Sequence, residues 1–380
     1  MSRLFLLPLL LVGLLGGILQ LPPVTGAFGQ YPLLFLSERK DLHIGTRRAH
    51  SNFFKVVQGD QYTYGMRSEG GDEIFDRDQF YDRLDKARQV SGNAPIVIFV
   101  HGCCVSFGEQ LLQANDLKKA INTSYARAPS EGAGAPVVLT YDWAAPFSYN
   151  TSLENCYVAQ SRFEDFMRGM VGRYGSDKIV IVAHSLGTLM VQNYARHIED
   201  SPEQAPFQAI IFSRADVDRD AFAECLPALK KYSKRLVVIS SHNDPNLYFS
   251  GMLRKVGIKF AQAATLPATL PVRLPAKLPG ARLKKERDTE AKSVEDKTDE
   301  VAEKAVLIEQ PKSPKVNLRL GQTKVARNFA SSVEVYDMSA LRIGHGIPYK
   351  FVGDLLFHDL EDFDMKKSSG GVLVVHGARP

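Results

Sequence analysis

The chain has 380 residues, of which 44% are hydrophobic and 23% are charged. This composition excludes a chain that is disordered throughout, a collagen and a small disulfide-dense protein. The formal net charge is +5, and because the basic residues form no dense cluster, no nucleic-acid partner is expected.

Residues 1–27 are predicted to be a targeting segment. Arg3 precedes an apolar run from Leu4 to Leu21, and prolines and small residues follow this run. A positive start, an apolar middle and a small-residue exit are typical of a secretory signal peptide. The run is also close to the length that spans a bilayer, so both a cleaved signal peptide and a retained membrane anchor stay open. In either case we expect an exported protein, periplasmic, secreted or anchored to the membrane and facing outside the cytoplasm.

Short apolar runs alternate with amphipathic segments over residues 28–255 and 316–365. The runs predict strands at Ile96–Val100, Pro136–Tyr141, Ile179–Val182, Gln208–Phe212, Arg235–Ser240 and Val333–Met338. The amphipathic segments predict helices at Gly108–Ile121, Ser161–Tyr174, Leu186–His197, Asp220–Tyr232, Pro245–Leu253 and Pro348–Phe357. This alternation indicates an α/β fold with a doubly wound, mostly parallel sheet covered on both faces. Nearer the N-terminus, Leu33–Leu36 and Phe53–Val57 are expected to add antiparallel edge strands.

Residues 256–315 are predicted to be a long disordered insertion before the last strand. Leucine-proline pairs recur between Leu266 and Pro279, where a helix is excluded, and a mixed-charge stretch follows from Lys284 to Lys304. Such a segment buries too little apolar surface to offset its ordering entropy. A tether that binds a surface or a partner is the alternative. Residues 366–380 are expected to be a tail.

The strand Ile179–Val182 leads directly into Ala183-His184-Ser185-Leu186-Gly187 and then into a helix. This pattern is the G-x-S-x-G nucleophile elbow with alanine in the first position. The turn is so sharp that small residues are needed two before and two after the serine. Ser185 is therefore the expected nucleophile and the Leu186 amide one expected oxyanion donor, whereas His184 is expected to point away and pack.

The loop after the strand Ile96–Val100 is expected to supply the second oxyanion donor. Gly102 allows a close backbone approach, so the Cys103 amide is the candidate. Cys103 and Cys104 suggest a redox pair, a metal corner or, as we favour, small buried side chains. No second close cysteine pair is present to complete a zinc site, and no metal or organic cofactor is expected. Trp143 is a candidate substrate-binding residue, with a core aromatic as the alternative.

The base and the acid of a catalytic triad should follow the serine in the order acid, then histidine. His345 lies between two glycines just past the strand Val333–Met338, in a loop that can reach the serine, so it is the predicted base. Asp244 follows the strand Arg235–Ser240 and is the favoured acid. Asp216, after the preceding strand, is the alternative acid. Either one would orient the imidazole and stabilise its cation.

Six motifs resemble, in order and spacing, a bacterial α/β-hydrolase family of unknown function that is described as esterase- or lipase-like. They are FVHGCCVSF, VVLTYDW, IVIVAHSLG, ADVDRDAF, VVISSHNDPNL and VYDMSALRIGHG. The resemblance covers Pro32–Phe357 once the insertion is skipped. Relatives typically have Tyr-Asn in place of Cys103 and Cys104, and most lack the leucine-proline segment. The resemblance implies the α/β-hydrolase fold and a Ser185, Asp244 and His345 triad, while ADVDRD, which recurs in relatives, keeps Asp216 open.

The expected function is that of an exported serine hydrolase. It would cleave carboxylic esters or related acyl bonds of a small-molecule or lipid substrate through an acyl-enzyme. An amidase, peptidase or thioesterase in the same fold is one alternative. The other is a noncatalytic binding protein of the bacterial envelope that uses the insertion as its contact. Membrane association is expected only through the N-terminal segment.

Overall fold

The computed structural model describes residues 32–39, 62–68, 71–127, 129, 134–198, 205–264, 318–357, 360–368 and 370–378. The predicted targeting segment, the predicted strand Phe53–Val57 and residues 265–315 of the predicted insertion lie outside these ranges. Within them, we find no helix that combines the length and the apolar character required to cross a membrane.

Eleven strands of the described residues form one sheet, in the order β10-β11-β9-β8-β7-β6-β4-β5-β1-β2-β3. Neighbouring strands pair in parallel from β11 through to β1, and antiparallel pairs occur only at the two edges. The predicted doubly wound, mostly parallel sheet is therefore confirmed. The strands are β1 (Leu33–Ser37), β2 (Thr63–Ser68), β3 (Gly71–Phe75), β4 (Ile96–Val100), β5 (Val137–Asp142), β6 (Ile179–His184), β7 (Ala209–Ser213), β8 (Leu236–Ser240), β9 (Glu334–Asp337), β10 (Phe363–Lys367) and β11 (Leu373–Ala378).

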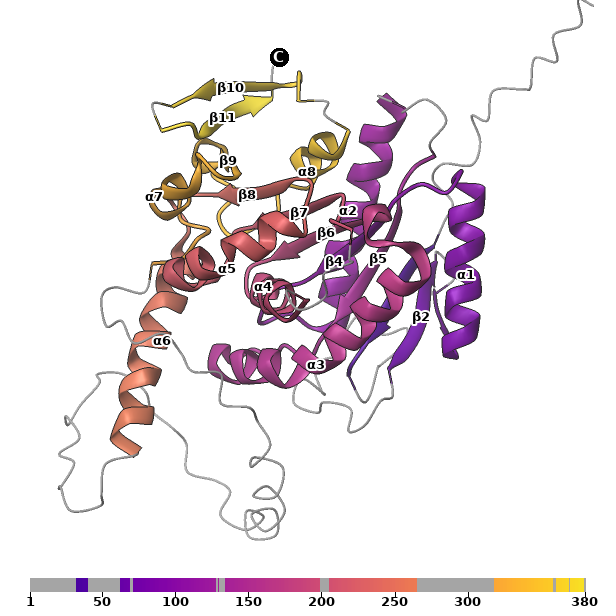
Figure 1. Cartoon of the computed structure of the whole chain (residues 1–380), viewed down its shortest axis with the longest axis horizontal. Coiled ribbons are helices and arrows are strands. Elements are labelled where there is room, and N and C mark those ends of the chain that lie inside the picture. Colours follow the sequence, from indigo (N-terminus) through magenta and orange to yellow (C-terminus); the bar gives the residue numbers. More distant parts are fainter. Residues whose placement is uncertain are drawn as a thin grey trace, which may run out of the picture.

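Helices cover both faces of this sheet (Figure 1). Side chains of each central strand alternate between two apolar cores: in β4, Ile96, Ile98 and Val100 enter one core, while Val97 and Phe99 enter the other. The first core is completed by α1 (Arg77–Val90), α3 (Tyr149–Tyr174), α4 (Gly187–His197) and α5 (Arg219–Lys231). The second core is completed by α2 (Phe107–Arg127) and α8 (Tyr349–Leu356). Two further helices are α6 (Pro245–Ala264) and α7 (Thr323–Ala326).

The edges of the sheet differ from the expectation. Leu33–Leu36 does form β1, but this strand lies inside the sheet, parallel to β5 and antiparallel to β2. The segment predicted as a tail contains β11 and the end of β10, so the strand after the insertion is not the last one. In β10 only Phe363 is buried, and charged residues fill most of its other positions. Edge strands of this kind carry a weak apolar signal, which explains the error.

The parallel strands bring distant segments of the chain to one edge of the sheet. Their carboxyl ends all point the same way, so the loops that follow β4, β6, β7, β8 and β9 meet there. Ligands of open α/β sheets bind at this edge. Each predicted site residue except Trp143, which follows β5, lies on one of these loops.

Candidate active site

Ser185 occupies the sharp turn between β6 and α4. Its φ of +50° lies in the left-handed region, which residues other than glycine rarely adopt. Its amide donates to the Ser213 carbonyl oxygen at 3.0 Å, which fixes the turn against β7. A Cβ at Gly187 would lie 2.4 Å from the His101 carbonyl oxygen, so the close approach of the β4 loop requires the small residue of the motif. Such strain is typical of functional turns.

His345 joins the serine to an aspartate. Its Nε2 lies 2.8 Å from the Ser185 Oγ, and its Nδ1 lies 2.8 Å from the Asp244 Oδ2. An ionised carboxylate can only accept, so Nδ1 carries the proton and Nε2 is free to accept from the serine hydroxyl. The other carboxylate oxygen of Asp244 accepts from the amides of Asn246 and Leu247. Three loops that lie far apart in the chain thus form one continuous chain of hydrogen bonds.

The surroundings of Asp244 favour its charged form. Burial alone would raise the pKa of this carboxyl, but the hydrogen bond from His345 and the Leu247 amide outweigh it and lower the pKa below its usual range. Arg214 adds a positive charge to the same effect. It is fully buried, and none of its guanidinium nitrogens has a hydrogen-bond partner among the described residues. Burial lowers the pKa of Arg214 to about 10, although the charges of Asp244 and Asp337 oppose this shift.

Asp216, the alternative acid, takes part in a different cluster. Its Oδ2 accepts from the Tyr149 hydroxyl at 2.6 Å, and its Oδ1 accepts from the Ser250 hydroxyl at 2.8 Å. The Arg319 Nε lies 3.2 Å from the same Oδ1. The side chain of Asp216 is therefore occupied by these partners, whereas His345 is bound by the favoured acid.

His184 has a role that the sequence did not indicate. The expected packing is present, since its ring lies 5.0 Å from the ring of His345. Its Nε2 also lies 2.8 Å from the His345 carbonyl oxygen, and because that oxygen only accepts, Nε2 carries the proton and donates. Burial and the neighbouring His345 imidazole lower the pKa of His184 to about 3. His184 therefore stays neutral and holds the loop that carries His345.

Because His184 is buried and neutral, the free energy of unfolding should depend on pH, and His184→Gln should weaken that dependence. In the unfolded chain a histidine has a pKa near 6.5, so between about pH 6.5 and about pH 3 the unfolded state binds a proton that the folded state does not. Above about pH 6.5 the protonation of His184 therefore does not reduce the free energy of unfolding, and below that value the free energy of unfolding decreases as the pH falls. Between pH 7.5 and 5.5 the wild type should lose about 1 kcal/mol more unfolding free energy than His184→Gln, whose amide can still donate. Denaturant unfolding at both pH values measures this difference.

The exposed His376 provides the control for this experiment. His376→Gln should lose as much stability on acidification as the wild type does. Identical losses in wild type and His184→Gln would show that His184 is not held neutral in the folded protein.

Gly102 brings the segment after β4, the predicted oxyanion loop, against the serine. A Cβ at Gly102 would lie 2.7 Å from the Ser185 Cβ. The His101 Nδ1 lies 2.8 Å from the Gly102 carbonyl oxygen and must donate to it. In a planar trans peptide the N–H points opposite to the C=O, so this bond turns the Cys103 amide away from His101. The oxyanion roles predicted for the Cys103 and Leu186 amides stay predictions.

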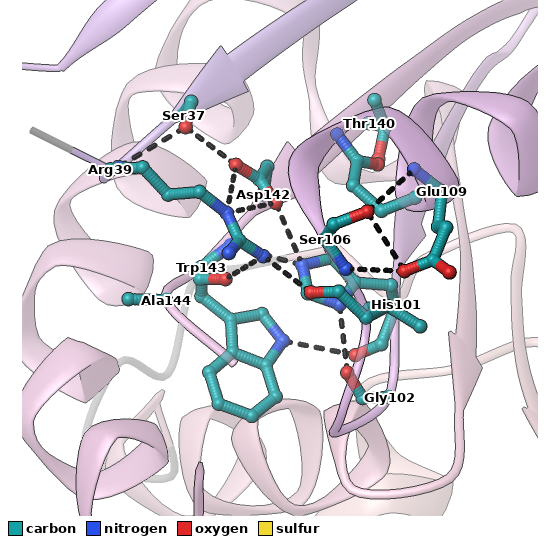
Figure 2. A network of polar contacts seen from close by, with 12 residues as sticks. Ser37, Arg39, His101, Gly102, Ser106, Glu109, Thr140, Asp142, Trp143 and Ala144 are labelled. Carbon is teal, nitrogen blue, oxygen red and sulfur yellow. Dashed lines mark hydrogen bonds and ion pairs between the residues drawn. The ribbon is translucent and has the colours of Figure 1, made fainter. Parts of the chain in front are cut away.

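A buried polar network supports this loop from behind (Figure 2). The Asp142 carboxylate accepts from the Ser37 hydroxyl at 2.5 Å and from the Arg39 Nε at 2.9 Å. The His101 Nε2 lies 3.1 Å from the Asp142 Oδ1. Asp142 is fully buried and Arg39 is only 3% exposed. Burial would raise the pKa of Asp142, but Arg39 and His101 lower it below its usual range.

Trp143 belongs to the same network. Its indole Nε1 donates to the His101 carbonyl oxygen at 2.9 Å, and its ring stacks on the imidazole at 5.4 Å between centroids. Arg39 donates to the carbonyl oxygens of Val105 and Trp143, both at 3.0 Å. Trp143 is fully buried. The structure therefore places it beneath the oxyanion loop and not on a surface where substrate could contact it.

No curated protein matches the chain. Among similar solved structures, an arylesterase is 14% identical with a TM-score of 0.25, and the match covers 41% of this chain and 60% of that chain. An esterase of Pyrobaculum calidifontis is 14% identical with a TM-score of 0.26 and coverages of 51% and 71%. Carboxyl esterase 2 of the fungus Tuber melanosporum is 10% identical with a TM-score of 0.27 and coverages of 62% and 81%. The chain thus spans less than two thirds of the arylesterase.

A family model described as "Alpha/beta hydrolase of unknown function" matches residues 76–280. The matched range is more than half of the chain. It contains the serine elbow and Asp244 and ends before His345. The predicted α/β-hydrolase fold and the predicted family are both confirmed: the chain belongs to the α/β hydrolase family of unknown function DUF900.

Proposed function

We propose that the protein is a serine hydrolase that cleaves carboxylic esters through an acyl-enzyme. The observation that supports this proposal best is the hydrogen-bond chain from Asp244 through His345 to Ser185, with 2.8 Å at each end of the imidazole. Nucleophile, base and orienting acid within hydrogen-bond reach are the geometric signature of nucleophilic catalysis.

Acylation starts with the serine hydroxyl. His345 Nε2 takes its proton as the Ser185 Oγ attacks the ester carbonyl, and Asp244 stabilises the resulting imidazolium. The carbonyl oxygen becomes negative and accepts from the amides of Cys103 and Leu186. His345 then gives the proton to the leaving alcohol, and the acyl group stays on Ser185.

Deacylation repeats these steps with water as the nucleophile. His345 takes a proton from water, water attacks the acyl carbon, and the proton returns to Ser185 as the acid leaves.

His184 and Arg214 support this cycle without contacting the reacting atoms, since His184 holds the His345 loop and Arg214 favours the charge of Asp244. Thioesters and activated amides have the same acyl chemistry and are included in the proposal as related bonds.

The proposed place of action is outside the cytoplasm. The composition of residues 1–27 supports export, and a retained anchor would hold the enzyme at a membrane surface where lipid esters are available. Intact mass of the exported protein distinguishes a cleaved leader from a retained one.

A fluorophosphonate probe tests the proposed function directly. The folded protein should form one covalent adduct, and peptide mass mapping should place it on Ser185, because only a serine activated by a neighbouring base reacts readily. Heat-unfolded protein should not react. p-Nitrophenyl esters of rising chain length then define the acyl preference. A folded sample that stays unlabelled and turns over none of these esters would contradict the proposal.

A further inference from the structure

Cys103 and Cys104 lie side by side on the oxyanion loop. Their Sγ atoms are 3.0 Å apart, and Cys104 has a φ of +63°. Against the expectation of small buried side chains, both are only partly buried, whereas Cys156 and Cys225 are buried. The proposed mechanism uses the Cys103 amide but neither thiol, so the pair of sulfur atoms is left without a role.

We propose that Cys103 and Cys104 are a reversible oxidation site, at which a small-molecule disulfide converts the two thiols into a vicinal disulfide that disables the oxyanion hole. The oxidation itself is inferred from the geometry of the two thiols. Its effect on turnover rests on the proposed function.

The two thiols are unequal in a way that suits this reaction. The contact with the Cys103 thiol lowers the pKa of Cys104, against the opposing effect of burial. The same contact, together with burial, raises the pKa of Cys103. The thiolate is the nucleophile in thiol–disulfide exchange. Cys104 therefore attacks first, and Cys103 resolves the intermediate.

The reaction balances with the oxidant named. The Cys104 thiolate attacks one sulfur of the small disulfide, which forms a mixed disulfide and releases one thiolate. Cys103 then loses its proton to solvent, and its Sγ attacks the Cys104 Sγ and releases the second thiolate. The two cysteines lose two electrons and two protons, and the small disulfide is reduced to two thiols. The Sγ separation of 3.0 Å means that only a small movement brings the atoms to the bond length of about 2.05 Å.

Closing this ring must move the loop. Adjacent Cα atoms are about 3.8 Å apart across a trans peptide, whereas disulfides usually join Cα atoms at least about 4.4 Å apart. The ring is therefore strained, and closing it requires a twist of the Cys103–Cys104 backbone that tilts the adjoining Gly102–Cys103 peptide, which carries the Cys103 N–H, away from its bond to His101. Because Gly102 is packed against Ser185, the loop cannot relieve this strain by shifting as a whole. The strain makes the bond easy to reduce, which is the property of regulatory disulfides.

Reaction with 2,2′-dithiodipyridine tests the site by stoichiometry. The folded wild type should release two equivalents of thiopyridone, lose about 2 Da and retain no pyridyl group, because ring closure expels the second thione. Cys104→Ser should lack this product. Cys225→Ser changes a buried thiol elsewhere and should behave like the wild type. No reaction in the folded protein, or pyridyl adducts that persist on both cysteines, would overturn the proposal.

Turnover of a p-nitrophenyl ester tests the consequence. Oxidised wild type should lose at least about tenfold in kcat/KM, since removal of one oxyanion donor commonly costs more than this, and dithiothreitol should restore the rate. Cys104→Ser should keep its rate and resist the oxidant. If the protein turns over no ester, the thione count still decides the site, and the proposed function alone fails. Full ring closure with unchanged turnover would overturn the coupling to the oxyanion hole.

Discussion

Asp244→Asn is expected to lower kcat about 10⁴-fold, with little change in KM for a small ester. The Asp244 carboxylate accepts from His345 Nδ1 at 2.8 Å and so keeps Nε2 free to take the serine proton. An asparagine amide can donate to Nδ1 instead, which moves the imidazole proton to Nε2 and blocks general-base catalysis. Single-turnover and steady-state rates with a p-nitrophenyl ester measure the loss, and circular dichroism verifies the fold.

Asp216→Asn is the matched control for this prediction. Asp216 is also a buried aspartate after a parallel strand, but its carboxylate contacts Tyr149 and Ser250 and not His345. Per folded molecule it should lose less than about tenfold in kcat, although the charges of Arg254 and Arg319 will then be less well balanced and stability will fall. A large loss with Asp216→Asn beside a small loss with Asp244→Asn would reverse the assignment of the acid.

The central strands were predictable because they are buried on both faces. Such strands appear in a sequence as near-continuous apolar runs. Each of the six predicted strands ends within two residues of the end of a strand in the structure. The elbow was predictable because steric crowding at Gly187 restricts the residue type at that position. In contrast, β2, β3 and β10 are short, partly exposed strands of mixed polarity at the sheet edges or, for β2, next to one. Whether such a segment forms a strand depends on the neighbouring strand with which it pairs, and a local sequence pattern does not show that neighbour.

The sequence narrows the candidates for the triad acid to two aspartates that chain order allows. Asp216 and Asp244 both follow apolar strands, and the choice between them depends on which loop faces His345, a property of the folded sheet. The hydrogen bond of His184 and the role of Arg214 could not be predicted, because both depend on burial beside partners that lie elsewhere in the chain.

The network beneath the oxyanion loop was missed for the same reason. Asp142 and Arg39 are 103 residues apart in the chain, and His101 pairs with Trp143 at a separation of 42 residues. In the sequence, Asp142 is a polar residue at the end of an apolar run, where a solvated loop is the ordinary expectation. Only the pairing of β1 with β5 places Ser37 beside Asp142 and turns both inward.

Asp142→Leu is expected to destabilise the protein by about 3–5 kcal/mol, because it leaves the buried guanidinium of Arg39 without its carboxylate. The double variant Arg39→Met with Asp142→Leu removes both charges and should be less unstable than the sum of its single variants, with a coupling of about 1–3 kcal/mol. Denaturant unfolding at pH 7 measures all four proteins of this cycle. The exposed pair Arg168 and Asp165 provides the comparison, and Asp165→Asn should cost less than about 1 kcal/mol.

The pH dependence of the unfolding free energies of these four proteins separates the effect of the Asp142 charge from the effect of its packing. The folded pKa of Asp142 lies below its usual range, so its contribution is complete above the ordinary carboxyl pKa and is lost as the pH falls through the lower folded value. The wild type should therefore lose more stability than the double variant on acidification through that window. Equal losses, or a cost of Asp142→Leu no larger than that of Asp165→Asn, would show that the buried charges of this network do not stabilise the fold.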